Sequence, residues 1–399
     1  MKSTYDKYYL FLILILFFLP LSIVAVEIFT GLFVLNFMIF GKYRDLDRDW
    51  LNISVLLIIF VHFLSVLIEG FPSNAIHSLL QSAWLLFIPI TRTYYFSFLE
   101  ASNLKKWFIN GQIVNSCFGV AEALGFNVID TYGQGHIGLV PFHIWSSMML
   151  ALGIIFIVLD LIDRKMYQSK IWPFLWLIFL LWELFSTSGR TGQAVMVIIL
   201  AYILFVKVRR KEIFMIAGLI LFVSLFAFSA FRSIWLSAYQ QVVAMISSGE
   251  YLTSVGLRIL YIKASIIMFI NHPVFGIGIG SFRVEFYRLV SLKLIPYVPK
   301  YLAGVIGPTN MYFQYISELG LIGISVLLSF VYSLFKFILS SSYDLRMMKI
   351  VTVMWMMIGG LADVTFTTWC LIIPFCIFVS LSIDENYKLI RLGSNNKNL

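Results

Sequence analysis

The sequence has little charge: only 12% of its 399 residues are Asp, Glu, Lys or Arg. With 60% hydrophobic residues and a mean hydropathy of +0.92, the chain has too little polar surface to cover a soluble globule. Its apolar residues gather in runs of about 18 to 20, the length that crosses a bilayer as a helix. The sequence therefore predicts an all-α fold, a polytopic integral membrane helical bundle.

Cysteine and histidine are also scarce, with three and five residues. Because Cys117, Cys370 and Cys376 all lie inside apolar runs, we interpret them as packing residues and expect neither a disulfide framework nor a thiolate metal site. No H-E-x-x-H sequence, Walker loop or carboxylate array is present. We therefore predict no metal and no cofactor.

The apolar runs predict about twelve membrane spans within a single membrane domain, residues 1–399. After the ninth span comes the one long segment between apolar runs, residues 231–309, in which we expect short helices. The predicted spans are 8–21, 23–41, 51–69, 76–96, 105–125, 138–161, 171–187, 190–206, 213–230, 310–335, 348–363 and 368–384.

The lysines and arginines of the connecting segments predict the orientation, since they favour the cytoplasmic side. Most of the 29 basic residues fall on the side that also holds both termini. Both termini are therefore predicted to be cytoplasmic, and residues 231–309 face outward, which in a bacterial inner membrane is the periplasmic side. The net charge of +9 then reflects topology beside anionic lipid, not nucleic-acid binding.

The long outward segment is basic, although the positive-inside bias should deplete that side. Attraction to lipid headgroups is one explanation. An anionic ligand such as a phosphate or pyrophosphate is the other. The basic residues from Phe231 to Gly320 are Arg232, Arg258, Lys263, Arg283, Arg288, Lys293 and Lys300.

Two arginines stand where helices are expected to begin. Arg190 follows the small polar turn Ser186–Gly189, where free backbone N–H groups and the helix dipole favour an anion; it could equally snorkel to the interface. Arg258 opens the apolar stretch 259–270, which we interpret as a helix packed against or dipping into the outer leaflet. A bidentate phosphate partner suits an arginine in that position.

Two further stretches carry local signals. The glycines of 273–282 permit close backbone approach, but without a preceding strand they are more typical of a tight turn than of a binding loop. Thr309 or Asn310 can cap the helix that follows Pro308.

These motifs together resemble the bacterial O-antigen ligase and O-antigen polymerase family of membrane glycosyltransferases. The resemblance covers residues 180–335 by motif and the whole chain by predicted topology. The four matching motifs are the S-x-G-R-like turn ending at Arg190, the G-x-R of Gly256–Arg258, the glycine-rich Pro273–Phe282, and Asn310–Gly323 with its N-x-Y-x-Q and E-L-G-L-I-G sequences.

The resemblance implies a metal-independent transfer of a glycan from an undecaprenyl-pyrophosphate carrier to an acceptor saccharide or lipid A-core at the periplasmic face. It implies that Arg190 and Arg258 are catalytic and bind the pyrophosphate, whose growing charge needs fixed cations. Asn310 and Tyr312 belong to the matching motif and are expected to bind substrate. Arg283 and Arg288 are candidates by charge alone.

One departure from the family pattern concerns the general base. The family's ligases carry histidine immediately before the motif asparagine, where this chain has Thr309, which cannot take up a proton at neutral pH. The reaction could rely mainly on leaving-group stabilisation, the chain could be an inactive relative, or another group could be the base. The missing histidine favours a polymerase over a ligase. The alternative bases are His136, His143, Glu285 and Glu318.

A different class of function also fits a basic bundle that faces a pyrophosphate, namely a transporter or flippase of lipid-linked saccharides. Such proteins often contain internal repeats and charges along a central path. The chain shows no convincing repeat, and its long segment is placed asymmetrically, which favours the enzyme. Protein O-oligosaccharyltransferases of the same family share these motifs and remain an alternative.

Overall fold

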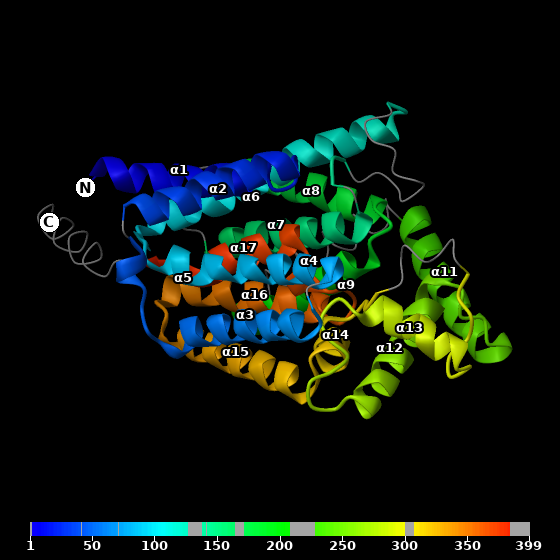
Figure 1. The fold of residues 1–399 in the computed structure, drawn as a ribbon. Helices are drawn as coiled ribbons and strands as arrows, with labels where there is room; N and C mark the ends of the chain where they lie inside the picture. The colour runs from blue at the N-terminus through cyan, green and yellow to red at the C-terminus, as the bar shows by residue number, and fades with distance from the viewer. Residues whose placement is uncertain are drawn as a thin grey trace, which may run out of the picture.

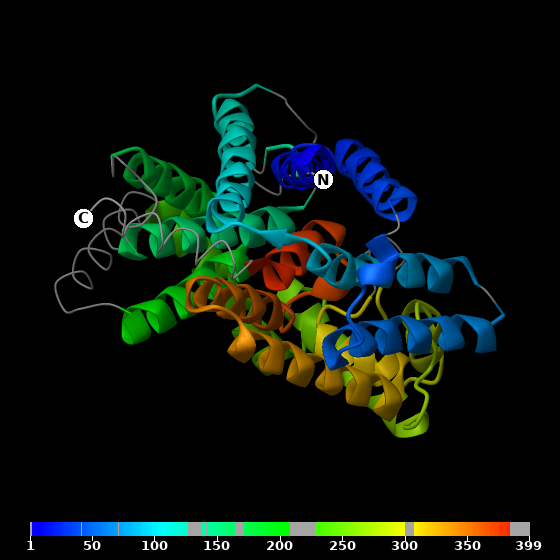
Figure 2. The same cartoon turned by 90° about the vertical axis from the view of Figure 1, so that its left-hand side faces the viewer.

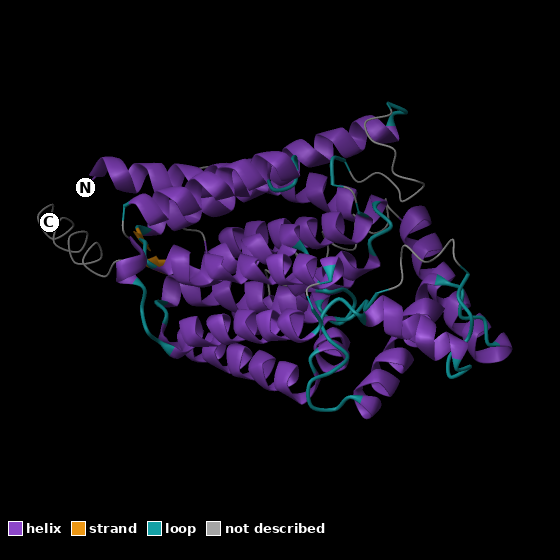
Figure 3. Ribbon diagram, viewed as in Figure 1, coloured by secondary structure: helices purple, strands orange, loops and turns teal. Residues whose placement is uncertain are grey.

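The computed structural model describes residues 2–40, 42–70, 72–126, 138–140, 142–163, 171–207, 228–299 and 307–383. Within these ranges the regular secondary structure is helical apart from one pair of two-residue parallel strands, and loops and turns connect the elements (Figure 3). Most helices run side by side in one bundle, and α11, α12 and α13 stand at the end opposite the N-terminus (Figure 1). The predicted helical bundle is thereby confirmed as an all-helical architecture.

The elements follow the apolar runs of the sequence. In chain order they are α1 (Lys2–Phe18), α2 (Ile23–Ile39), η1 (Lys42–Asp45), α3 (Trp50–Ile68), α4 (Ser73–Ser82), η2 (Ala83–Leu86), α5 (Phe87–Arg92), β1 (Tyr95–Phe96), α6 (Phe98–Ala123), α7 (His143–Asp163), α8 (Ile171–Ser186), α9 (Arg190–Lys207), α11 (Phe228–Ser248), α12 (Ser254–Asn271), α13 (Phe282–Ser291), α14 (Met311–Glu318), α15 (Gly320–Ser340), α16 (Tyr343–Gly359), η4 (Thr365–Thr367), α17 (Trp369–Ser380) and β2 (Ser382–Ile383).

Nine of the described helical segments are strongly apolar, as membrane-embedded helices are. By length and composition, α3, α7, α9, α12 and α15 could each cross a bilayer. Four shorter apolar segments join them: Tyr8–Phe18, Ile23–Ile39, Ile171–Ser186 and Trp369–Ser380. The chain is a membrane-embedded protein, and its number of spans stays a prediction, since most of the predicted span 213–230 lies outside the described residues.

Two predicted spans are interrupted. The predicted span 76–96 is divided among α4, a 3₁₀ turn, α5 and β1. Pro89 cannot donate the amide hydrogen bond that would continue a regular helix from α4 into α5. Residues 310–335 divide at Leu319, since Gly320 has a left-handed backbone with φ of 64°. Both breaks depend on single residues within otherwise continuous apolar runs.

The centre of the bundle is α17, whose residues Cys370–Ser380 are all buried. Viewed from the N-terminal end, this helix (red) lies in the middle of the others (Figure 2). Cys370 and Cys376 are therefore packing residues, as predicted, whereas Cys117 is exposed on α6. An apolar surface facing lipid explains the difference, because a bundle in a bilayer need not bury every apolar side chain.

The segment after α9 forms a small core of its own. On α12, Leu260, Tyr261 and Met268 pack against Phe282 and Phe286 of α13, separately from the main core of the bundle. By length and composition α12 could also span a bilayer, with a mean hydropathy of 1.4, the lowest of the five candidates. Its predicted position at the outer leaflet stays a prediction.

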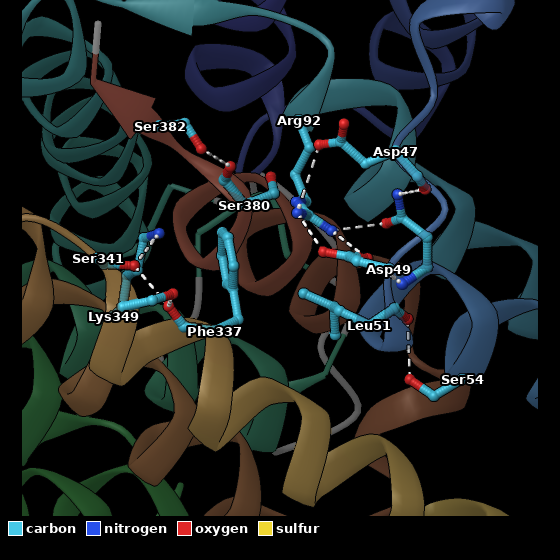
Figure 4. Close-up of polar contacts among 12 residues, drawn as sticks. Asp47, Asp49, Leu51, Ser54, Arg92, Phe337, Ser341, Lys349, Ser380 and Ser382 are labelled. Atoms are coloured by element: carbon cyan, nitrogen blue, oxygen red, sulfur yellow. Dashed lines mark hydrogen bonds and ion pairs between the residues drawn. The ribbon is translucent and has the colours of Figure 1, made fainter. Parts of the chain in front are cut away.

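Ion pairs and hydrogen bonds connect the helices at the end of the bundle opposite α11, α12 and α13 (Figure 4). The buried Arg92 guanidinium donates to both carboxylate oxygens of Asp49, at 2.9 and 2.5 Å, and to Asn52 Oδ1 at 2.9 Å. It also lies 4.5 Å from the ring centroid of Phe337, whose ring is 4.0 Å from Lys349 Nζ. These contacts join α3, α5, α15 and α16.

Three more contacts close the same end. Lys105 pairs with Asp160, Lys207 Nζ lies 2.6 Å from Asp163 Oδ1, and β1 pairs with β2 near the end of the described chain. Basic residues that were predicted to share one side of the membrane therefore meet at one end of the bundle. The long segment stands at the other.

Candidate functional site

The turn that begins α9 packs tightly on the first turns of α7. A Cβ at Gly189 would overlap Ser147 and the His143 carbonyl oxygen, and a Cβ at Gly192 would overlap the Ser147 backbone. The Gly192 N–H donates to Ser147 Oγ at 3.3 Å. The two glycines thus allow Arg190 to start its helix directly beside His143.

Arg258 is positioned by the cap of α12. The side chain of Thr253 accepts a hydrogen bond from the Gly256 N–H at 3.1 Å, as an N-cap residue does. Gly256 is buried against the backbone of Tyr251 and Glu250, where a Cβ would collide. The glycine of G-x-R therefore lets the preceding chain fold back, and Arg258 follows at the start of the second helical turn, half-buried.

The charges of the two motif arginines act on one another, although the residues come from separate helices. Arg190 and Arg258 lie within electrostatic range of one another, and both act on the His143 side chain at the start of α7. Arg258 also interacts with the carboxylate of Asp363, which lies between α16 and η4. We call Arg190, Arg258, His143 and Asp363 the arginine site.

Asp363 was not predicted as a site residue. Its Oδ2 accepts a hydrogen bond from Trp145 Nε1 at 3.2 Å, and its Oδ1 accepts one from the Val364 N–H at 2.8 Å. Burial raises the pKa of the Asp363 carboxyl above its ordinary value, although the Val364 hydrogen bond, Arg258 and Trp145 oppose the rise. The carboxyl is held in place and is more basic than an exposed aspartate.

Asn310 holds the loop that carries Asp363. Its Oδ1 accepts hydrogen bonds from the N–H groups of Tyr312 and Phe313, so the predicted cap of α14 is Asn310. Its Nδ2 donates to the Leu361 carbonyl at 2.7 Å, and the next residue, Met311, donates its N–H to Gly360. The motif asparagine therefore positions the loop of Asp363, two residues beyond Leu361.

The glycine-rich motif wraps around the end of α14. Gly276, Gly278 and Gly280 have φ of 70°, 95° and 75°, a left-handed backbone that favours glycine. The N–H groups of Ile277 and Gly278 donate to the carbonyls of Ser317 and Glu318, both at 2.9 Å. The expected tight turn is confirmed, and it fastens one matching motif to another.

Two carboxylates complete this turn. Glu318 is buried and accepts hydrogen bonds from the Gly280 N–H at 3.1 Å and from Gln314 Nε2 at 3.2 Å. Glu69 of the α3 end accepts one from Ser281 Oγ at 2.6 Å. Burial raises the pKa of Glu318 to about 7, which suits a general base. However, both of its carboxylate oxygens already accept hydrogen bonds, from Gly280 and Gln314.

Replacing Gly278 with alanine is expected to destabilise the protein. The added Cβ would overlap the Glu69 carboxylate, and φ of 95° strains any L side chain, so we expect a loss of about 1–3 kcal/mol. Thermal melting of the purified chain in detergent measures it. Gly31→Ala is the matched control, because a Cβ at Gly31 meets nothing within 4 Å. Equal melting of both variants would contradict this account of the turn.

The remaining predicted site residues lie elsewhere. Exposed Arg283 and Arg288 are on α13, where Arg288 forms a two-point pair with Glu285, with its Nε and Nη2 at 2.7 and 2.5 Å from the two carboxylate oxygens. Tyr312 donates its hydroxyl to the Met357 carbonyl at 2.8 Å. His136 lies outside the described residues. Of the four alternative bases, the structure brings only His143 to the arginine site among the residues it describes.

Comparison with known families gives one matching sequence model. Residues 175–328 match a sequence model of the family described as O-antigen ligase. The matched range contains Arg190, Arg258 and the glycine-rich motif, and it ends before Asp363. No curated protein matches the chain significantly. The resemblance deduced from the four motifs is therefore confirmed for this range.

Proposed function

We propose that the chain belongs to the O-antigen ligase family, whose sequence model matches residues 175–328, and that it transfers a glycan from undecaprenyl pyrophosphate to an acceptor saccharide. The family implies lipid-linked glycan donors and saccharide acceptors in general. The transfer would take place at the periplasmic face of a bacterial inner membrane, where the arginine site would lie if both termini are cytoplasmic.

The observation that carries the proposal is the electrostatic proximity of Arg190, at the start of α9, and Arg258, near the start of α12. An acceptor hydroxyl attacks the anomeric carbon of the donor, the bond from that carbon to the pyrophosphate oxygen breaks, and the pyrophosphate keeps the electron pair. Two guanidinium groups fixed beside the departing group stabilise its growing charge. Arginine suits this role because its planar fork pairs with two phosphate oxygens.

The hydroxyl proton must go to a base. Asp363 and His143 are the groups at the arginine site that can take it up. We assign the proton to Asp363, because its carboxyl has a raised pKa and is held by Trp145 and Val364. His143 lies beside two cations, which disfavour a further positive charge there.

Deletion of the chain from its bacterial host, followed by glycolipid analysis, tests the proposal. A lost polymerase leaves lipid A-core bearing a single repeat. A lost ligase leaves naked core and accumulates carrier-linked polymer. The histidine missing at Thr309 favours the first result. Unchanged glycolipids and unchanged glycoproteins would refute glycan transfer by this chain.

Thr309→Ala is expected to retain activity, because no proton transfer is assigned to Thr309 and the cap of α14 is Asn310. In the same strain, Asn310→Ala is expected to lower activity, since it removes the cap and the hydrogen bond to Leu361 that positions the loop of Asp363. The length distribution of the surface polysaccharide measures both. Complete loss in Thr309→Ala with normal protein level would show that Thr309 itself takes part.

A further inference from the structure

A buried carboxyl lies between α6 and α8, away from the arginine site. The side chain of Glu183 is fully buried, and neither of its carboxyl oxygens has a hydrogen-bond partner among the described residues. Gly119 of α6 packs directly on it, and a Cβ there would overlap the carboxyl. An ionised carboxylate without partners is very costly to bury, so Glu183 must carry a proton while these helices remain packed.

Other unsatisfied polar groups continue along the same face of α6. Gln112 and Ser116 are fully buried, and neither the amide of Gln112 nor the hydroxyl of Ser116 has a partner in the described part of the chain. Together with Gly119 they recur at helical spacing, so their side chains face the same neighbours. A Cβ added at Gly153 of α7 would lie 3.6 Å from Gln112 Cγ and 3.8 Å from Leu180 Cδ1 of α8, so the three helices pack closely there. The junction of α6, α7 and α8 is therefore polar within an apolar bundle.

A second carboxyl, that of Glu122, lies about one helical turn beyond Gly119, the glycine that packs on the Glu183 carboxyl. The charge of Glu122, near the end of α6, acts on Glu183, and Glu122 Oε2 accepts a hydrogen bond from the Gly138 N–H at 3.1 Å. The titratable and charged groups at this end of the helices packed on α8 are Glu122, His143, Arg190 and Arg232. Among the described residues, Glu122 is the one whose charge acts on Glu183. Two carboxyls whose charges act on each other favour the state in which one of them is protonated.

We propose that Glu122 and Glu183 form a proton-binding site within the membrane, in which Glu183 holds the proton and Gln112 and Ser116 are its polar lining. Ionisable groups inside a bilayer are expensive and usually functional, and these have no part in glycan transfer. The proton-binding site is close to the arginine site along the chain. The Glu183 carbonyl accepts a hydrogen bond from the Thr187 N–H, and the turn that leads to Arg190 starts at this residue. Loss of the proton would drive water between α6 and α8.

Labelling with dicyclohexylcarbodiimide tests the proposal, since this apolar reagent modifies protonated carboxyls in membranes. The full-length chain in detergent is treated from pH 5.5 to 9, and the modified peptides are identified by mass spectrometry. We expect Glu183 to be labelled at low pH and labelling to fall at least fivefold as the pH rises. Because the peptide itself reports the site, the result does not depend on a variant that fails to fold.

Variants sharpen the test. Glu183→Gln should lose the label, whereas Glu122→Gln should keep it and move the fall to lower pH, since removing a neighbouring negative charge favours ionisation of Glu183. Glu250→Gln, at an exposed residue, is the control and should change nothing. Absence of label on Glu183 in folded protein at every pH would overturn the proposal. Protection by sodium chloride but not by choline chloride would also overturn it, because the ligand would then be sodium.

Discussion

Arg258→Ala and Arg258→Lys are both expected to abolish glycan assembly, with a loss of about 100-fold or more. Arg258 is half-buried and lies within electrostatic range of Arg190 and Asp363, which is where we propose that the leaving pyrophosphate gains charge. Lysine keeps the charge but cannot pair with two phosphate oxygens at once. Separation of surface polysaccharide by size, from a deletion strain carrying each variant, measures the effect.

Arg288→Ala is the matched control for this experiment. Arg288 is also an arginine of the long segment 231–309, but it is exposed and already paired with Glu285 on the same helix. We expect it to support near-normal polysaccharide, and immunoblots of the membrane fraction must show equal amounts of each variant. Normal polysaccharide in the Arg258→Ala strain would refute the role of this guanidinium in leaving-group stabilisation.

The sequence predicted the helices well, because a bilayer demands long apolar runs and charged residues mark their ends. It could not locate the interruptions in these runs. The division at Leu319 depends on Gly320, whose left-handed backbone fits against the carbonyls of Pro273 and Val274, more than 40 residues earlier. A contact between distant segments leaves no periodic signal in either one.

The motif arginines could be predicted because their signal is local in the sequence. A glycine or a small polar turn beside each of them marks the start of a helix. Asp363 was missed because its significance is tertiary. It follows an apolar helix with no motif around it, and it reaches Arg258 only because Asn310 holds the adjoining loop. Glu183 could have been noticed in the sequence, because it is an acidic residue inside the apolar run 171–187. Its proximity to Glu122 could not, because Glu122 lies on another helix.

Asp363→Asn is expected to lower the rate of glycan transfer roughly 100-fold, the scale of a lost general base. Asparagine is nearly isosteric and can still accept a hydrogen bond from Trp145 or Val364, so the loop should stay in place while the basic group is lost. Transfer by purified protein, with a lipid-linked donor and a saccharide acceptor, measures the rate.

The pH profile separates a base from a merely structural residue. The raised pKa of Asp363 means that its carboxyl becomes protonated at a higher pH than an ordinary aspartate. Wild-type activity should therefore fall as the pH is lowered through that value, and the residual activity of Asp363→Asn should lack this acidic limb. His143→Gln should keep the limb, because His143 is not the assigned base. Loss of the limb in His143→Gln, with its retention in Asp363→Asn, would transfer the role to the histidine and leave Asp363 to position Arg258.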